Sequence, residues 1–205
     1  TEINSELNQK QKQIVLIRLI EFAYSSDESI AELELEFLST VANVFNISNE
    51  EFEISQSYAS HRKINEIVDV PEILLINKQT ESPFVNARHV KHEYFDGDLL
   101  LLHIKSTDII FARYFGKGKI TINGSEVMND AAHVLSQGSV IRSGKAQPIY
   151  YNDIIRSFLN DAQQSEIKFS VSNVEYVFHS GKVGLHNTNF EASSGNLIGI
   201  MGGSG

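Results

Sequence analysis

The first third of the chain has its apolar residues at helical spacing. Between about Gln9 and His61, apolar positions recur every three or four residues, a pattern typical of helices with one buried face. The segment QIVLIRLIEFAY, residues 13–24, is apolar on most sides and predicts a mostly buried helix. The capping-box spacing S-x-x-E occurs twice downstream, at Ser29 with Glu32 and at Ser48 with Glu51. We therefore expect a small bundle of three helices.

After Pro71 the pattern changes to short β-branched and aromatic runs separated by turn residues. The runs that predict strands are EILLIN, NARHVKHEYF, DLLLLHIKS, DIIFARYF, KITING, SEVM and SVIRS. Asp96-Gly97 and Asn123-Gly124 each lie between two such runs, and both dipeptides supply the positive φ that tight hairpins require. We expect an antiparallel β module over about residues 84–150, with the strands on either side of Asp96-Gly97 paired.

A third pattern begins at Tyr150. Residues 150–166 predict a short helix or an amphipathic linker with Ile154, Phe158 and Leu159 on one side. The segment IKFSVSNVEYVF then alternates as a strand does, and a Gly-rich break leads to a terminal apolar strand, LIGIM. The predicted fold class is α+β, with a helical bundle in residues 1–65, a connection in 66–83, the antiparallel β module in 84–150, a helical linker in 151–166, and the first β-strands of a further domain in 167–205.

Composition narrows the classes of function. The 205 residues are 41% hydrophobic and 21% charged, values typical of a globular protein that can bury a core. The net charge of −9 argues against a nucleic-acid partner, because binding to phosphates requires clustered Lys and Arg. The absence of cysteine excludes disulfides, thiolate zinc sites and cysteine nucleophiles. No run approaches about 18 apolar residues, so we expect no membrane span here.

The last ten residues lead from the apolar segment LIGIM into GGSG. A loop that cradles phosphates needs several main-chain N–H groups pointing inward, and only glycines let the backbone curl that tightly. The first four positions of the Walker A pattern, G-x-x-x-x-G-K-[ST], would be filled by Gly202, Gly203, Ser204 and Gly205. We therefore predict the opening of a phosphate-binding loop; the alternative is a disordered tail or a cloning linker.

Residues 167–205 contain two strands, an N-V-x-Y-x-F segment, a later strand at NTNFEA, a Ser-Gly turn and the strand before GGSG. This order resembles the beginning of an ATP-binding cassette (ABC) domain. The resemblance implies that Phe178 or Tyr176 stacks on adenine. It also implies that the full-length protein binds ATP and Mg²⁺, works with a transporter membrane domain in the same chain or another subunit, and lies at the cytoplasmic face of the inner membrane. We expect an ATPase only of the full protein, because Walker A is incomplete here.

The segment 25–53, SSDESIAELELEFLSTVANVFNISNEEFE, resembles the TerB-like helical domains associated with tellurite resistance. The positions that match are Asp27, Ile30, Glu34, Phe37, Val41 and the turn Asn46-Ile47-Ser48, while Glu28 replaces a usual glycine. The resemblance implies that Asp27 and Glu34 could bind a divalent cation such as calcium. The alternative is that the carboxylates around this helix start stabilise the helix dipole and that Glu34 lies on a solvated face.

Residues 116–142, GKGKITINGSEVMNDAAHVLSQGSVIR, resemble the last strands of forkhead-associated domains, which bind phosphothreonine. The phosphate-binding part of that family is not recognisable here, and we expect Arg113 and Arg142 to be surface residues. The histidines His89, His92 and His103 are not expected to form a metal site, because His89 and His92 fall on opposite faces of one predicted strand.

These observations favour one function and leave one alternative. The preferred interpretation is an N-terminal regulatory or docking fragment of an ABC transporter ATP-binding subunit, with the membrane domain or a regulatory protein as partner. The alternative is a free-standing acidic module that binds a protein or a divalent cation and has no ATPase role.

Overall fold

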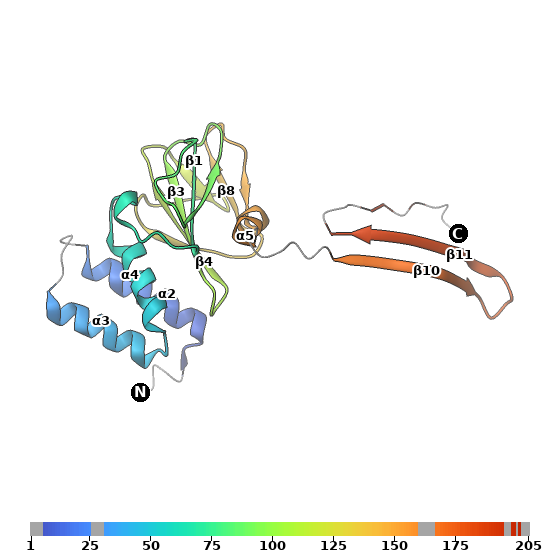
Figure 1. Ribbon diagram of the computed structural model, residues 1–205, viewed down its shortest axis with the longest axis horizontal. Helices are drawn as coiled ribbons and strands as arrows, with labels where there is room; N and C mark the ends of the chain where they lie inside the picture. The colour runs from blue at the N-terminus through green and yellow to red at the C-terminus, as the bar shows by residue number, and fades with distance from the viewer. Residues whose placement is uncertain (1–5, 26–30, 160–166, 195–197, 200, 202–205) are drawn as a thin grey trace. The chain divides into compact units, whose positions relative to one another are not determined.

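The computed structural model describes residues 6–25, 31–159, 167–194, 198–199 and 201, and the chain divides into two compact units, residues 1–159 and 160–205 (Figure 1). Each unit is described by itself. Asp27 and the glycine-rich residues 202–205 lie outside the described residues, as do the predicted cap Ser29 and the second half of the predicted linker helix. The described residues have an α+β fold, as the sequence predicts.

The helical bundle is confirmed. Its helices are α2 (Gln9–Ala23), α3 (Glu32–Val44) and α4 (Asn49–Ser60), followed by a short 3₁₀ turn, η1 (Ile64–Glu66). Ser48 caps α4 as predicted, because its hydroxyl accepts a hydrogen bond of 3.2 Å from the Glu51 N–H. The predicted cap of α3 is wrong: the helix begins after Ala31, whose N–H donates to the Glu34 carboxylate at 3.1 Å. None of the described helices is long and apolar enough to pass through a bilayer.

The turn between α3 and α4 follows from residues 46–48. Helix α3 ends at Val44 with Phe45 as its C-cap, and Asn46 takes a left-handed conformation with φ of 54°. Asparagine tolerates this conformation better than most residues. The Ile47 N–H then donates back to the Ala42 carbonyl at 3.0 Å, which satisfies one of the last carbonyls of the helix. The buried Ile47 side chain places Ser48 at the start of α4.

Strands from residues 73 to 150 form two sheets. The five-stranded sheet has the order β2-β1-β3-β4-β7 and contains β1 (Ile73–Asn77), β2 (Arg88–Lys91), β3 (Asp98–Ile104), β4 (Ile109–Phe115) and β7 (Ala132–Leu135). The four-stranded sheet has the order β6-β5-β8-β9 and contains β5 (Ile120–Ile122), β6 (Ser125–Glu126), β8 (Val140–Ser143) and β9 (Ile149–Tyr150). Helix α5 (Tyr151–Leu159) follows directly, so the predicted linker helix is confirmed over this part.

Two expectations about strand pairing have opposite outcomes. Asn123 and Gly124 have φ of 53° and 85° and connect β5 to β6, so the predicted tight hairpin is confirmed. The hairpin across Asp96-Gly97 is wrong: β2 pairs in parallel with β1, and β3 pairs with β1 and β4. Strand β1 therefore lies between the two strands that we expected to pair, and the sheet starts at Ile73 rather than near residue 84.

The helices and the five-stranded sheet share one core. One face of β3 packs through Leu100 and Leu102 in a cluster with Leu16, Ile17 and Tyr58 of the helices. The other face packs through Leu99 and Leu101 in a cluster that includes Ile141, Ile149 and Ile154 from the second sheet and α5. A strand covered on both faces reads as a continuous apolar run, which explains the four consecutive leucines. The bundle and the β module are therefore one compact unit (Figure 1).

The second unit contains an antiparallel hairpin of β10 (Lys168–Val177) and β11 (Val183–Ser193). Both predicted strands are confirmed. Every residue of the two strands is exposed or half-buried, so the hairpin has no core of its own. The terminal strand predicted at LIGIM is not present at the residues described there, Ile198, Gly199 and Met201.

Candidate functional site

The two aromatic residues predicted to stack on a base lie together at the end of the hairpin. Tyr176 belongs to β10, and Phe178 directly follows the end of that strand at Val177. Their ring centroids are 5.0 Å apart and the rings meet at 83°, edge to face. Tyr176 is 55% exposed and Phe178 48% exposed, so each ring presents a free surface.

The turn and the opposite strand determine where the Phe178 ring lies. The Phe178 N–H donates to the Lys182 carbonyl at 2.9 Å, and the Gly181 N–H donates to the Phe178 carbonyl at 2.8 Å, which closes the turn. Gly181 has φ of 78°, a conformation that favours glycine. On β11, a Cβ atom added to Gly184 would overlap the Phe178 ring. Gly184 therefore leaves the space in which this ring rests.

This arrangement can bind a flat ligand by stacking. An exposed aromatic face binds a base without demanding specific hydrogen bonds, and such stacking contributes about 1–3 kcal/mol per base. The edge-to-face contact with the neighbouring ring restrains the orientation of both rings. The predicted phosphate-binding residues, Gly202, Gly203, Ser204 and Gly205, lie outside the described residues, so their position relative to the aromatic pair stays a prediction.

The predicted cation ligands have a different local explanation where they are described. The Glu34 carboxylate accepts a hydrogen bond from the Ala31 N–H and so contributes to capping α3. Asp27 lies outside the described residues. Among the residues that the structure describes, no three His, Asp or Glu side chains are grouped closely enough to hold a metal ion.

His89, His92 and His103 of the β module each contact a different group. The imidazole Nε2 of His89 lies 2.9 Å from Asn77 Oδ1, and that of His103 lies 2.8 Å from Asp108 Oδ1. His92 packs against Phe95 with ring centroids 5.9 Å apart. His89 pairs with Leu75 of β1 rather than opposite His103, because β2 lies at the edge of the sheet.

The polar site that the sequence did not reveal is centred on Arg113 in β4. We expected a surface residue, but Arg113 is only 2% exposed. Its Nη1 donates to the Tyr58 main-chain carbonyl, and its Nη2 donates to Asp130 Oδ1 at 2.5 Å. Its guanidinium carbon also lies 4.9 Å from the centroid of the Phe115 ring. A buried charge requires such partners. The sequence signal for this site was the single arginine within the apolar run IIFARYF, because a charged residue inside a buried strand must be paired.

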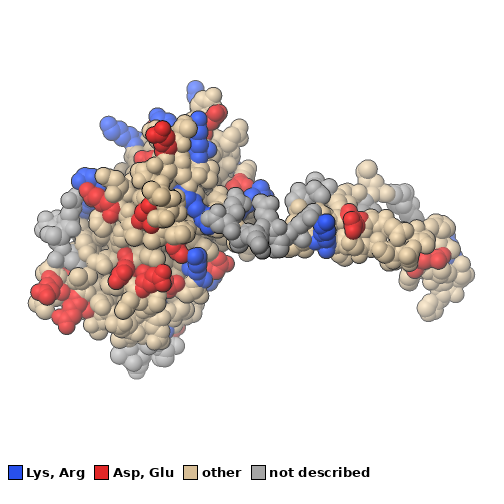
Figure 2. All heavy atoms as spheres, in the orientation of Figure 1, with Lys and Arg blue, Asp and Glu red and all other residues tan. Residues whose placement is uncertain are grey.

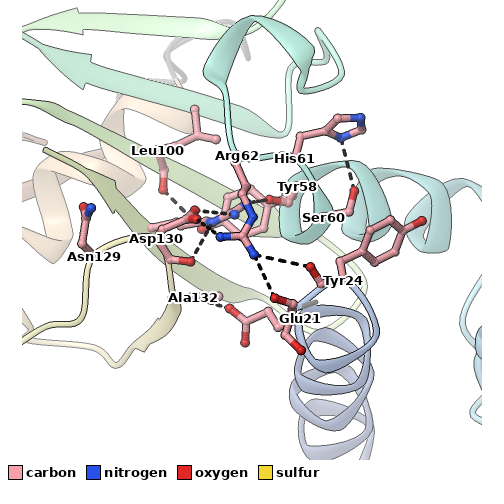
Figure 3. Close-up of polar contacts among 12 residues, drawn as sticks. Glu21, Tyr24, Tyr58, Ser60, His61, Arg62, Leu100, Asn129, Asp130 and Ala132 are labelled. Carbon is pink, nitrogen blue, oxygen red and sulfur yellow. Dashed lines mark hydrogen bonds and ion pairs between the residues drawn. The ribbon is translucent and has the colours of Figure 1, made fainter. Parts of the chain in front are cut away.

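The contacts of Arg113 continue to the helices through Asp130 and Arg62 (Figure 3). Arg62 Nη1 lies 3.7 Å from Asp130 Oδ2, and Arg62 Nη2 donates to the carbonyls of Tyr24 and Ser25 at 3.4 and 3.3 Å. The Ala132 N–H at the start of β7 donates to Glu21 Oε1 of α2 at 2.6 Å. We call these residues the junction network. It joins α2 and α4 to β4 and β7 and leaves Arg113 buried, so Arg113 does not present its charge to a phosphopeptide.

A hollow of about 430 Å³ lies elsewhere between α4 and the sheet. Its polar lining residues are Asn46, Ser48, Glu50, Glu51, Glu72, His103, Lys105 and Ser106. Glu51 accepts hydrogen bonds from Gln13 Nε2 at 3.2 Å and from the Ser106 hydroxyl at 2.9 Å, and Lys105 donates to Glu72 at 2.6 Å. Burial favours a raised pKa for Glu72, but the hydrogen bond and charge of Lys105 outweigh it and lower the pKa. Glu51, Ser106, Glu72 and Lys105 are thus engaged in internal hydrogen bonds.

No family model, curated protein or solved structure matches this chain.

Proposed function

We propose that this chain is the N-terminal part of the ATP-binding subunit of an ABC transporter at the cytoplasmic face of the inner membrane. In this proposal, residues 1–159 form a regulatory or docking unit beside the ATPase domain. Residues 167–205 are the first part of that domain. The observation that carries the proposal is the exposed pair Tyr176 and Phe178 on a hairpin whose sequence leads into LIGIMGGSG.

Different residues would bind different parts of the nucleotide. Tyr176 and Phe178 would hold the adenine by stacking, and the main-chain N–H groups of residues 202–205 would bind the phosphate oxygens. Mg²⁺ in the full protein would neutralise phosphate charge, with its hydroxyl ligand supplied by a position after Gly205. The aromatic residues need no charge for this role.

The lack of a core in the β10–β11 hairpin also supports the proposal. A two-stranded hairpin alone is marginally stable in water, and apolar side chains usually cover a neighbouring surface. This hairpin carries exposed apolar residues from both strands, including Phe169, Val174, Leu185 and Phe190. In the proposed protein, the remainder of the nucleotide-binding domain would pack against them.

The direct test is ATP binding by the full-length natural protein, measured by isothermal titration calorimetry with Mg²⁺ present. We expect the wild type to bind ATP and Phe178→Ala to bind about 5- to 150-fold more weakly, the loss that corresponds to one stacked base. Ser172→Ala is the control: Ser172 lies on β10 and is exposed, and its substitution removes neither a ring nor an apolar side chain. We expect this control to bind ATP like the wild type.

Two results would overturn the proposal. The first is a full-length wild-type protein that does not bind ATP. The second is ATP binding that Phe178→Ala and the double substitution Tyr176→Ala with Phe178→Ala both leave unchanged, because the aromatic pair would then have no role at the base.

A second candidate function is a free-standing acidic module that binds a partner or a divalent cation. The observation that favours it is that α3 carries Glu32, Glu34 and Glu36 and no basic residue. Calorimetry with calcium or magnesium on the wild type and on Asp27→Asn tests the cation. Binding that the substitution removes would support the cation site, and identical flat titrations for both proteins would eliminate it.

A further inference from the structure

Helix α3 is apolar on two sides. Its inner side buries Leu38 and Ala42 against the bundle core. Its outer side presents Leu33, Phe37 and Val44, which are 78%, 58% and 43% exposed. At about 100° per residue, these three residues fall within about 40° of one another and on the side opposite Ala42. We call Leu33, Phe37 and Val44 the outer stripe.

An outer stripe of this kind is unusual for a surface helix. A helix that packs on one core normally carries charged or polar residues on its opposite side. Contiguous exposed apolar patches that are rimmed by polar residues mark interaction surfaces. The stripe extends over twelve residues from Leu33 to Val44, a rise of about 16 Å along the helix axis. This length and straight form suit another helix packed alongside α3.

The charges around the stripe are all negative. Glu32 and Glu36 flank it on one side and Glu34 on the other, as the helical spacing requires. Between Arg18 and Arg62 the sequence contains nine acidic residues and no Lys or Arg, so this segment accounts for the whole net charge of −9. Figure 2 shows acidic side chains gathered at the end of the helical layer where α3 begins.

We propose that the outer stripe of α3 is the docking surface for a basic amphipathic helix of a partner protein. The apolar side of such a helix would cover Leu33, Phe37 and Val44, and its Lys and Arg residues would lie against the glutamates on both flanks. A second copy of this chain fits less well, because two acidic rims would face each other. An anionic membrane surface would also repel this segment. The inference does not depend on nucleotide binding.

The probe is a fluorescein-labelled helical peptide of about 18 residues, five turns, with Leu on one face and Lys on the other. A matched peptide has Glu in place of every Lys. Fluorescence anisotropy measures the binding of each peptide to the 205-residue chain. We expect the Lys peptide to bind and the Glu peptide not to bind. We also expect the affinity to fall as salt is added, because the flanking charges are exposed.

Two pairs of variants test whether binding of the Lys peptide depends on the outer stripe and its flanking glutamates rather than on the total charge of the chain. The double substitution Leu33→Ser with Phe37→Ser should weaken the Lys peptide at least about tenfold, whereas Val85→Ser, at a site 91% exposed on the β module, should leave its affinity unchanged. Glu32→Gln with Glu36→Gln should weaken it more than Glu50→Gln with Glu53→Gln, which removes the same charge from α4. Equal effects within either pair would overturn the proposal.

Two further measurements do not depend on how the variants fold. In amide NMR spectra of the wild type, the Lys peptide should shift the signals of residues 32–44, and shifts confined to other elements would contradict the proposed site. Sedimentation should show a monomer. A dimer that Leu33→Ser with Phe37→Ser dissociates would mean that a second copy covers the stripe, which would also overturn the proposal.

Discussion

Arg113 in strand β4 donates a hydrogen bond to the main-chain carbonyl of Tyr58 in helix α4, although the two residues are 55 positions apart in the sequence. Both residues are almost completely buried. The other arm of the same guanidinium binds Asp130, which also lies near Arg62. Separation of the helices from the sheet would expose the shared core and leave a charge without its partners. The helices and the sheet therefore belong to one cooperative unit.

We predict that Arg113→Met strongly destabilises this unit. The substitution leaves the Tyr58 carbonyl without its donor and removes the closer of the two cations beside Asp130. Because Asp130 is partly exposed and keeps Arg62 beside it, the main loss is the charged hydrogen bond to the buried Tyr58 carbonyl, which is worth about 1.5–3 kcal/mol. Urea unfolding, followed by far-UV circular dichroism, measures the change. Arg142→Met is the control, because Arg142 is exposed on β8, and it should change the free energy of unfolding by no more than about 0.5 kcal/mol. Similar losses for the two variants would contradict the structural role of Arg113.

We predict that Tyr58 makes the unfolding free energy fall at alkaline pH. Burial raises the pKa of Tyr58 far above its ordinary value of about 10, and the nearby Arg113 charge offsets only part of this. The unfolded chain releases the phenolic proton near pH 10 and the folded chain keeps it. The stability is therefore full below about pH 10 and is lost as the pH rises above it.

The test compares the wild type with Tyr58→Phe by urea unfolding between about pH 8 and about pH 11. Phenylalanine lacks the hydroxyl that donates to the Leu100 carbonyl at 3.3 Å, so the variant should be less stable by about 1 kcal/mol at pH 8. Above pH 10 its free energy of unfolding should fall less steeply, by as much as about 1.4 kcal/mol per pH unit. Tyr114 and Tyr151 also have raised pKa values, but they are present in both proteins and cancel in the comparison. If the free energy of unfolding fell with pH equally steeply in both proteins, the pKa of Tyr58 would be the same in the folded and unfolded chain.

We predict that Asp69 stabilises the connection before β2 at neutral pH and not in acid. Its carboxylate accepts hydrogen bonds from the N–H groups of Val85, Asn86 and Ala87 at 2.8, 2.9 and 2.6 Å. Partial desolvation acts to raise the pKa of Asp69, but these hydrogen bonds outweigh it and lower the pKa. The contribution is therefore present above the unfolded pKa of about 3.9 and is lost as the pH falls through the lower folded value.

The corresponding experiment is thermal unfolding of the wild type and Asp69→Asn from pH 7 downwards. The variant should have a lower Tm at pH 7, and the difference should shrink as the wild type becomes protonated below about pH 4. Glu93→Gln removes one carboxylate from an exposed position and should not reproduce this pattern. A Tm difference that is independent of pH would contradict a role for the charge.

Local features of the fold could be predicted from the sequence, whereas long-range pairing could not. The helical spacing predicted all three bundle helices, and Asn123-Gly124 predicted its hairpin, because both signals act over a few residues. The pairing of β2 with β1 depends on residues more than ten positions apart, and the favourable Asp96-Gly97 turn suggested a different partner. The burial of Arg113 could not be predicted either, because it depends on Asp130 and on a helix carbonyl far along the chain.

The candidate site likewise contains residues that could be predicted from the sequence and one that could not. The resemblance pointed to Phe178 or Tyr176, and the structure has the two rings in contact. The importance of Gly184 could not be predicted, because the pairing of β10 with β11 contains register shifts that decide which residue lies beneath the Phe178 ring. Sequence spacing alone does not locate such shifts.

Our last prediction concerns Gly184 and depends on the proposed nucleotide site. A methyl group in Gly184→Ala would overlap the Phe178 ring, and the ring would move because its outer edge is freer than the paired backbone. In the 205-residue chain, the aromatic proton NMR shifts of Tyr176 and Phe178 should therefore change, because each ring senses the other. In the full-length protein, Gly184→Ala should weaken ATP binding several-fold.

A double-substitution cycle tests whether Gly184 acts through Phe178. In the Phe178→Ala background no ring remains to be displaced, so Gly184→Ala should leave the weakened ATP affinity unchanged. If it weakens ATP binding equally in both backgrounds, it acts through the strand instead. Changed ring shifts with an unchanged ATP affinity would mean that Phe178 moves without contacting the base. The two measurements thus distinguish the position of the ring from its role in binding ATP.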